Sequence, residues 1–161
     1  MKKLSDNGNT PLRILFVCND NLCRSVMAEY MLKEMTRSLG LEHRFYIDSA
    51  GTSEEITARE IFGEAADKLR SMNIQVEKHL ARRMLWEDYD RFDLLIGMDK
   101  STVKKMLELT VSDPHDKIRL LMDFAGEQGD IPDPWESGDF DQTCTKLQRG
   151  LFGLLNEIGS V

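Results

Sequence analysis

The sequence predicts an α/β fold in which a four-stranded parallel sheet carries helices on both faces. Four short apolar runs, at 13–17, 44–48, 92–97 and 117–121, have the length of strands. They alternate with longer segments whose apolar residues recur at helical spacing. Strands that alternate with helices of this length form right-handed βαβ units, so helices are expected to cover both faces of the sheet.

The helical segments between the strands are expected at 24–39, 58–72 and 100–109. In the first of these, Met27, Met31 and Met35 share one face. A last helix is expected after Asp139, because a capping residue with Gln142 three positions later marks a helix start. Its apolar positions predict packing on the sheet, at Phe140, Cys144, Leu147, Leu151, Leu154 and Ile158.

The length of 161 residues fits one domain with its own core. Residues 1–10 have a basic start but no apolar stretch, so we expect a flexible leader and not a signal peptide. Residues 11–161 are expected to form the single domain. No apolar run reaches transmembrane length, which predicts a cytoplasmic protein without membrane partners.

Composition excludes several classes of function. Three cysteines cannot form a disulfide framework, and none of the three histidines has metal-ligand spacing to them, so no metal site is predicted. The net charge of −7 argues against a nucleic-acid partner, because affinity for nucleic acid comes largely from Lys and Arg. Any bound anion must therefore be recognised by a local feature.

The segment VCNDNLCRS, at 17–25, follows the first apolar run and provides such a feature. Open α/β sheets bind ligands at the carboxyl ends of their strands, and the N–H groups of a helix start bind phosphate. Arg24 begins the helix, and its guanidinium suits a tetrahedral oxyanion. Helix-end amides and a nearby arginine favour the thiolate of Cys18. This pattern predicts a phosphate-binding loop with a nucleophile. Taken alone, Cys18 would be better interpreted as an inert buried residue, and Arg24 and Ser25 at the helix start change that interpretation.

VCNDNLCRS resembles the signature of the low-molecular-weight protein tyrosine phosphatases, whose loop reads C-x-x-N-x-C-R-S near the N-terminus. The resemblance covers nearly the whole chain, because four further segments follow the family's order and approximate spacing: DSAGT at 48–52, HLAR at 79–82, DLLIGMD at 93–99 and DIPDPW at 130–135. It implies hydrolysis of phosphotyrosine in proteins through a phosphocysteine intermediate, without a cofactor. A bare C-x5-R is weakly specific, but the five segments together are specific.

The resemblance implies three catalytic residues. Cys18 would take the phosphoryl group, Arg24 would bind its equatorial oxygens, and Asp133 would protonate the leaving group and later activate water. Asp133 lies between Pro132 and Pro134, which stiffen the backbone around it. Without the resemblance, this segment reads as a turn with a solvated acid.

The resemblance also implies a set of substrate-binding residues, namely Asn19, Asp20, Asn21, Leu22, Cys23, Ser25 and Trp135. Among these, Ser25 would hydrogen-bond the Cys18 thiolate, and Trp135 would stack on the phosphotyrosine ring. A hydrogen-bond network that supports the loop would consist of Asn21, Ser25, Ser49 and His79. Simpler interpretations are a left-handed turn residue at Asn21, a strand-end hydroxyl at Ser49 and an ordinary exposed His79.

Two positions, Glu55 and Asp20, depart from the common family pattern, and a third, Asp99, is assigned a structural role. Glu55, next to Glu54, stands near a position where many members carry a tryptophan, so one aromatic wall is expected to be missing and the rim to be more negative. We therefore expect weaker selection for acidic phosphotyrosine peptides than for neutral or basic ones. Asp20 replaces a usual glycine and is expected to face solvent, and an aspartate there would tolerate a left-handed backbone. Asp99 is expected to cap the following helix.

Cys23 is expected to trap an oxidised Cys18 as a disulfide, as in the family, with simple packing as the alternative. Two relatives offer rival activities. Phosphoarginine phosphatases commonly carry threonine before the second loop cysteine, and Leu22 here favours phosphotyrosine. Arsenate reductases of this fold need two further cysteines near the third strand, whereas Cys144 lies in the last helix. A phosphate-binding module without turnover is the alternative outside enzymes.

The partners implied by the resemblance are a tyrosine-phosphorylated protein, including a tyrosine kinase, and phosphate or other oxyanions as inhibitors.

Overall fold

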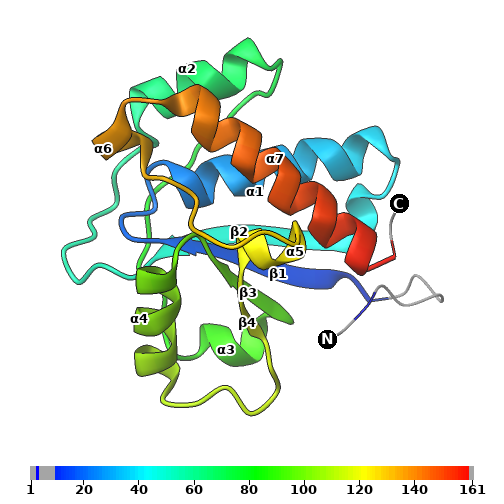
Figure 1. Cartoon of the computed structure of the whole chain (residues 1–161), viewed down its shortest axis with the longest axis vertical. Coiled ribbons are helices and arrows are strands. Elements are labelled where there is room, and N and C mark those ends of the chain that lie inside the picture. Colours follow the sequence, from blue (N-terminus) through cyan, green and yellow to red (C-terminus); the bar gives the residue numbers. More distant parts are fainter. Residues whose placement is uncertain (1–2, 4–9, 160–161) are drawn as a thin grey trace.

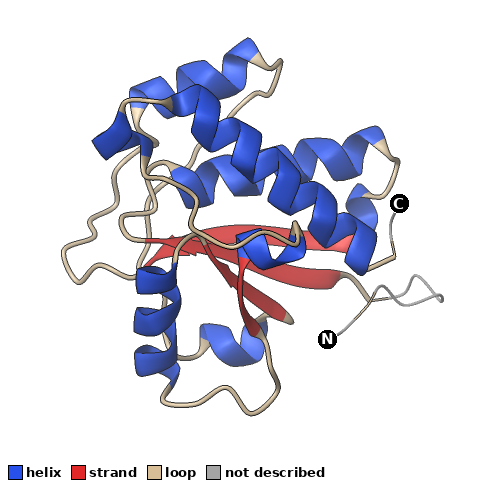
Figure 2. Cartoon of the chain, in the orientation of Figure 1, coloured by secondary structure: helices blue, strands red, loops and turns tan. Residues whose placement is uncertain are grey.

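The computed structural model describes residue 3 and residues 10–159. The expected leader at 1–10 therefore lies outside the described residues, apart from Lys3 and Thr10. The sheet has four parallel strands in the order β2-β1-β3-β4 (Figure 2). The strands are β1 (Leu12–Cys18), β2 (Phe45–Gly51), β3 (Leu94–Gly97) and β4 (Ile118–Leu120). The predicted α/β fold is confirmed.

The helices cover both faces of this sheet, as expected (Figure 1). Helices α1 and α7 lie on one face, and α3 and α4 lie on the other. Their bounds, with those of the remaining helices, are α1 (Arg24–Ser38), the short 3-10 helix η1 (Glu42–Arg44), α2 (Gly63–Ser71), α3 (Asp88–Arg91), α4 (Lys100–Thr110), α5 (Leu121–Phe124), α6 (Pro134–Ser137) and α7 (Phe140–Glu157).

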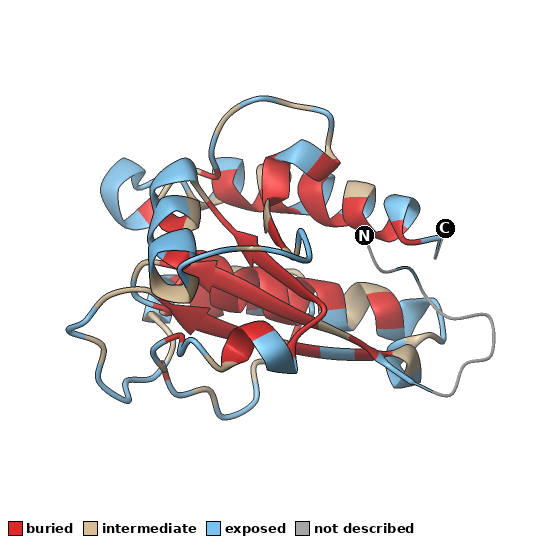
Figure 3. Cartoon of the chain, turned by 90° about the horizontal axis from the view of Figure 1, so that it is seen from below, coloured by how far each residue is buried: buried red, intermediate tan, exposed pale blue. Residues whose placement is uncertain are grey.

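Strand β1 is buried on both faces, which explains why its sequence is apolar without alternation. Ile14 and Phe16 belong to the apolar cluster formed with α1 and α7. Leu15 and Val17 belong to a second cluster, on the side of α3 and α4. Figure 3 shows the strands as the buried centre of the molecule. This burial fixes the position of Cys18 at the end of the strand.

Helix α7 begins as the sequence predicts. The Asp139 side chain accepts a hydrogen bond from the backbone N–H of Gln142 at 2.9 Å. The helix packs against α1 and α5. Five of the six expected apolar positions are buried, namely Cys144, Leu147, Leu151, Leu154 and Ile158, which follows the last residue of the helix. It therefore supplies much of the core beside α1.

The helix expected at 58–72 is shorter in the structure, because α2 begins only at Gly63. The residues before it make tertiary hydrogen bonds in place of helical ones. The Arg59 carbonyl accepts from the N–H of Ala81 at 2.8 Å, and the Phe62 N–H donates to the Leu22 carbonyl at 3.0 Å. Residues 52–62 therefore form a loop, here called the wall loop, that lies against the segment following β1.

The topology places that segment at a ligand-binding position. Strand β1 lies between β2 and β3, so the connection after β1 runs to one side of it and the connection after β2 runs to the other side. Open α/β sheets bind ligands at the carboxyl ends of the strands where the strand order reverses in this way. Cys18 ends β1 opposite Gly51 of β2. A side chain at Gly51 would lie 2.6 Å from the Asn19 carbonyl oxygen and 2.4 Å from Ile56 Cδ1. Glycine is therefore required for the close approach of the two segments.

Candidate active site

The phosphate-binding loop, residues 19–23, turns sharply between β1 and α1. Asn21 adopts a left-handed backbone with φ of 56°. The left-handed position falls at Asn21, as the simpler interpretation of that residue predicted, and the Asn21 side chain also anchors the loop. No side chain caps α1 at Cys23 within the described chain. The first N–H groups of α1 are thus available to an anion.

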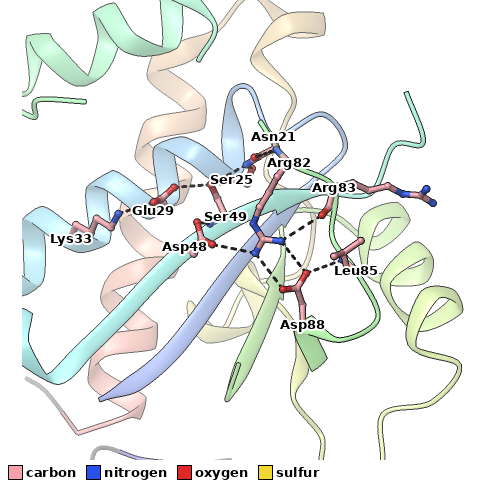
Figure 4. Close-up of polar contacts among 10 residues, drawn as sticks. All are labelled: Asn21, Ser25, Glu29, Lys33, Asp48, Ser49, Arg82, Arg83, Leu85 and Asp88. Atoms are coloured by element: carbon pink, nitrogen blue, oxygen red, sulfur yellow. Dashed lines mark hydrogen bonds and ion pairs between the residues drawn. The ribbon is translucent and has the colours of Figure 1, made fainter. Parts of the chain in front are cut away.

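A hydrogen-bond chain leads from the loop into the core (Figure 4). Asn21 Nδ2 donates to Ser25 Oγ and to Ser49 Oγ, both at 2.9 Å. Ser49 Oγ donates to the buried carboxylate of Glu29 at 2.7 Å. Since Ser25 Oγ already accepts from Asn21, its own proton is free to point to Cys18 Sγ, 3.0 Å away. The chain thus directs a hydroxyl proton at the cysteine sulfur.

The other side of Asn21 is held by the segment at 79–82. The Arg82 N–H donates to Asn21 Oδ1 at 3.0 Å, and His79 Nε2 donates to the Asn21 carbonyl at 3.0 Å. The Arg82 guanidinium lies between Asp48 and Asp88, at 3.1 Å from each (Figure 4). Burial acts to lower the Arg82 pKa, but these two carboxylates outweigh it and raise the pKa. All four expected support residues are therefore brought together.

Sequence reasoning missed Glu29, Arg82 and the two aspartates that hold Arg82. Glu29 follows Ser25 by one helical turn on a buried face of α1, and a lone acid on such a face is a usable signal. Arg82 is the last residue of the HLAR segment. Asp48 and Asp88 lie on different elements, and only the tertiary structure joins them.

Arg24 is fixed by contacts from two other loops. Its Nη1 donates to Asp99 Oδ2 at 2.6 Å and to the Ile131 carbonyl at 3.0 Å. Burial acts to lower the Arg24 pKa, but the charges of Cys18, Asp99 and Asp133 outweigh it and raise the pKa. The guanidinium therefore carries its charge beside the loop.

Asp99 has two contacts at once. Its Oδ1 accepts from the Thr102 N–H at 2.7 Å, so the predicted helix cap is confirmed. Its Oδ2 binds Arg24, a contact that the sequence did not predict. Burial acts to raise the Asp99 pKa, but the hydrogen bonds from Arg24 and Thr102 lower it overall. Asp99 therefore stays ionised and holds Arg24 in place.

Asp133 lies across the cleft from the loop. Its Oδ1 accepts from the Trp135 N–H at 3.0 Å and caps α6. Its Oδ2 lies 3.8 Å from Arg24 Nη2, and the side chain is 29 % exposed. One carboxyl oxygen is thus held by the backbone, while the other faces the anion-binding region and remains in contact with solvent.

Cys18, Arg24 and Asp133 line one cleft with a volume of about 510 Å³. The wall loop forms its opposite side with Glu55 and Ile56, so no aromatic residue stands at the position of Glu55. An aromatic side chain does enter from further along the chain: the ring centroid of Phe62 lies 4.4 Å from that of Trp135. This contact was not predicted, because residue 62 was expected inside a helix.

Asp20 is exposed at the rim of the cleft, as expected. Its carboxylate accepts from Asn19 Nδ2 at 3.0 Å, and Asn19 Oδ1 accepts from Lys105 Nζ at 3.2 Å. The lysine offsets part of the negative charge that Asp20 brings to an anion-binding loop.

The three cysteines of the chain are free and buried. Burial and the neighbouring Cys18 charge raise the pKa of Cys23 to about 12. Burial also raises the pKa of Cys144, whose sulfur contacts Met72 Sδ at 3.9 Å in the core. Cys23 and Cys144 are therefore neutral thiols near pH 7. In the described ranges, 3 and 10–159, no group of three potential ligands could hold a metal ion, and no helix could cross a membrane.

Comparison with known proteins identifies the family. Residues 13–160 match the family model for low molecular weight phosphotyrosine protein phosphatase. Low molecular weight protein-tyrosine-phosphatase YfkJ of Bacillus subtilis is 30% identical over 91% of this chain and 96% of its own length. Its crystal structure covers 92% of this chain and 94% of its own, with a TM-score of 0.88.

A second similar structure comes from another kind of phosphatase. The crystal structure of a Drosophila arginine phosphatase is 26% identical and has a TM-score of 0.84, covering 92% of this chain and 99% of its own. A relative from Schizosaccharomyces pombe, named low molecular weight phosphotyrosine protein phosphatase, is 32% identical over 79% of this chain and 83% of its own. On the match of nearly its whole length, the chain belongs to the low molecular weight phosphotyrosine protein phosphatase family.

Proposed function

We propose that this protein hydrolyses phosphotyrosine in proteins through a phosphocysteine at Cys18. The observation that carries the proposal is the meeting of three groups, Cys18, Arg24 and Asp133, at one cleft. Cys18 receives a hydrogen bond from Ser25, Arg24 is held beside them by Asp99, and Asp133 faces Arg24 from the opposite side. This set contains a nucleophile, an anion-binding group and a proton donor, which are the parts that phosphoryl transfer through a covalent intermediate requires.

In the first step, the phosphoryl group binds to the N–H groups at the start of α1 and to Arg24. The Cys18 thiolate attacks phosphorus in line with the leaving oxygen. The S–P bond forms, the O–P bond breaks, and the proton of Asp133 passes to the departing phenolate oxygen. Arg24 stabilises the charge that spreads over the equatorial oxygens.

In the second step, the Asp133 carboxylate takes a proton from water, and the water oxygen attacks phosphorus. The S–P bond breaks, phosphate is released, and the sulfur leaves as a thiolate. The Ser25 hydroxyl, whose oxygen accepts a hydrogen bond from Asn21, donates a hydrogen bond to that sulfur and stabilises its charge. Asp133 is then protonated again and ready for the next substrate.

Phosphotyrosine is favoured as the substrate by the exposed Trp135, whose ring can pack on an aryl group at the cleft. Leu22, in place of a threonine, points the same way. Phosphoarginine remains the second candidate, because the rim residues Glu55 and Glu60 suit the positive charge of a guanidinium group. Arsenate reduction is disfavoured, because the chain has no cysteine between residues 24 and 143.

We further propose that the protein acts in the cytoplasm on a tyrosine-phosphorylated protein, including a tyrosine kinase, and that phosphate and similar oxyanions inhibit it by occupying the loop. Cys23 is proposed to capture a sulfenic acid at Cys18 as a disulfide. The raised pKa of Cys23 keeps this thiol neutral and reduced, so Cys18 is the first thiol to react with an oxidant.

A substrate panel tests the proposal. The rate constant kcat/KM is measured for a phosphotyrosine peptide, phosphoarginine and arsenate with thioredoxin, using the wild type and Cys18→Ser. We expect the phosphotyrosine peptide to be turned over fastest, and Cys18→Ser to lose at least about 10⁴-fold in activity while still binding phosphate. Faster turnover of phosphoarginine would favour the second candidate, and full activity in Cys18→Ser would exclude the mechanism.

A further inference from the structure

Phe62 is tied to the phosphate-binding loop. It precedes α2, and its backbone N–H donates to the Leu22 carbonyl at 3.0 Å. Its own carbonyl accepts from the N–H of Ala66 at 3.1 Å, so both polar backbone groups of Phe62 are engaged. The Phe62 backbone therefore keeps a defined position relative to the loop that binds the phosphoryl group.

The Phe62 ring contacts two other aromatic rings. Its centroid lies 4.4 Å from that of Trp135, with an angle of 62° between the planes. The centroid of the Phe140 ring lies 6.3 Å from that of Phe62, and the two planes are nearly parallel, at 22°. Edge-to-face contact at this separation is a favoured aromatic geometry. Phe140, the first residue of α7, thus supports Phe62, and Phe62 in turn supports Trp135.

Trp135 keeps most of its surface despite this contact. The residue is 65 % exposed, it lines the cleft, and it follows Asp133 by two positions on the short helix α6. A helix of four residues, capped only by Asp133, provides little to restrain so large an exposed side chain. The Phe62 ring is the aromatic contact that restrains it in the described structure.

The opposite side of the cleft cannot restrain an aryl ring in the same way, because it presents Glu55 and Ile56. Ile56 is set by its close packing on Gly51, and Glu55 is exposed. A substrate ring therefore meets aromatic surface only on the side of Phe62 and Trp135, the two aromatic residues that line the cleft in the described part of the chain. The orientation of Trp135 on that side then matters more than it would between two aromatic walls.

From these contacts we propose that Phe62 is a positioning residue that sets the selectivity for aryl phosphates by holding the Trp135 ring in place. The inference rests on the proposed phosphotyrosine activity. Phe62 touches no group that takes part in the chemistry, so its loss changes binding of the aryl ring and leaves the phosphoryl transfer steps intact. Its effect is expected to vanish when Trp135 is absent.

The test compares two non-hydrolysable ligands with the same anionic group. Binding of benzylphosphonate and methylphosphonate is measured by titration calorimetry for the wild type, Phe62→Ala, Phe62→Leu and Trp135→Ala. We expect Phe62→Ala to weaken benzylphosphonate by about three- to tenfold and methylphosphonate by less than about twofold. Phe62→Leu keeps an apolar side chain at the site and guards against a general folding defect. Phe152→Ala, on the exposed side of α7 and outside the cleft, is the control.

Two further readouts separate positioning from general damage. With a phosphotyrosine peptide, Phe62→Ala should raise KM by a similar factor and keep kcat within about twofold. In the Trp135→Ala background, removing Phe62 should change benzylphosphonate binding by less than about twofold. Equal weakening of both phosphonates, or an undiminished effect without Trp135, overturns the inference. Failure of the wild type to bind either phosphonate contradicts the proposed function itself.

Discussion

The phosphate-binding loop and the wall loop border the same cleft, yet they are held by different kinds of contact. In the first, Asn21 is fully buried, and its side chain bonds Ser25 of α1, Ser49 of β2 and the backbone of Arg82. In the wall loop, residues 54–55 and 57–60 are exposed, and its ties to other segments are chiefly backbone hydrogen bonds such as those of Ser53 and Phe62. Such backbone bonds constrain the side chains little.

This difference separates chemistry from selectivity. A group that must hold a thiolate and an anion needs fixed hydrogen bonds, because a small displacement of reacting atoms is costly in rate. A rim that recognises the rest of a substrate can change its side chains without disturbing that geometry. We therefore expect substitutions in and behind the phosphate-binding loop to have large effects, and substitutions on the wall loop to have small ones.

Among substitutions that keep the Cys18 nucleophile, the largest effect is expected at Asp133, which faces the phosphate-binding loop. Asp133→Asn cannot protonate the leaving group or activate water, so kcat for a phosphotyrosine peptide should fall by about a hundredfold or more. With 4-nitrophenyl phosphate, whose leaving group needs no proton, the first step should stay fast. Stopped-flow measurement should then show a burst of 4-nitrophenolate before slow turnover. A uniform loss without a burst would contradict the role of Asp133 in the second step.

Substitutions of two neighbouring arginines, Arg82 and Arg83, compare how much the buried network and the wall loop contribute to stability. Arg82→Ala leaves the buried Asp88 carboxylate without its guanidinium partner and should lower the free energy of unfolding by about 3 kcal/mol. Arg83 points away from this network in Figure 4 and pairs with Glu54 of the wall loop, which is 85% exposed. Arg83→Ala should leave stability unchanged within error. Urea unfolding measures both, and equal losses would remove the distinction.

Oxidation provides a smaller test within the phosphate-binding loop. Because Cys23 is neutral and Cys18 is the nucleophile, peroxide should first oxidise Cys18, and Cys23 should then close a disulfide. Peptide mass spectrometry should detect the linked pair in the wild type. Cys23→Ser should lose activity irreversibly, several-fold faster than the wild type. Recovery of the Cys23→Ser protein with a reductant after long exposure would argue that Cys23 only packs in the core.

The smallest effects are expected from the charges on the wall loop. Glu55 and Glu60 at the rim should disfavour acidic residues flanking a phosphotyrosine, by about two- to fivefold in kcat/KM, with Arg59 beside them offsetting part of their charge. Glu55→Gln and Glu60→Gln should reduce this difference in kcat/KM between acidic and neutral peptides, and added salt should do the same. Equal or better turnover of acidic peptides by the wild type would show that the rim charge does not select substrates.

The sequence predicted the fold well because its signals were local. Buried apolar runs such as 13–17 and the cap at Asp139 depend on neighbouring residues, and the structure confirms both. The strand and helix order then fixed the parallel sheet. The predicted start of α2 was wrong because the Phe62 N–H donates to the carbonyl of Leu22, forty residues earlier in the chain. No local pattern reveals that contact.

The site was predicted through its motifs and incompletely beyond them. The expected residues around Cys18 do meet, since each motif lies at the end of a strand or in an adjoining loop. Glu29, Asp48 and Asp88 were missed because the chain has 28 acidic residues, and the sequence around each of them does not show which residue it pairs with. Their importance follows from burial and distance, which only the folded chain reveals.

The most direct test of the account is to find the phosphoryl group on the enzyme. Asp133→Asn is mixed with 4-nitrophenyl phosphate and quenched within the burst, and ³¹P NMR and peptide mass spectrometry then locate the phosphate. The account predicts up to one phosphoryl group per molecule, bound to sulfur in the peptide that contains Cys18. An unmodified Cys18 peptide during the burst, together with retained turnover in Cys18→Ser, would contradict it.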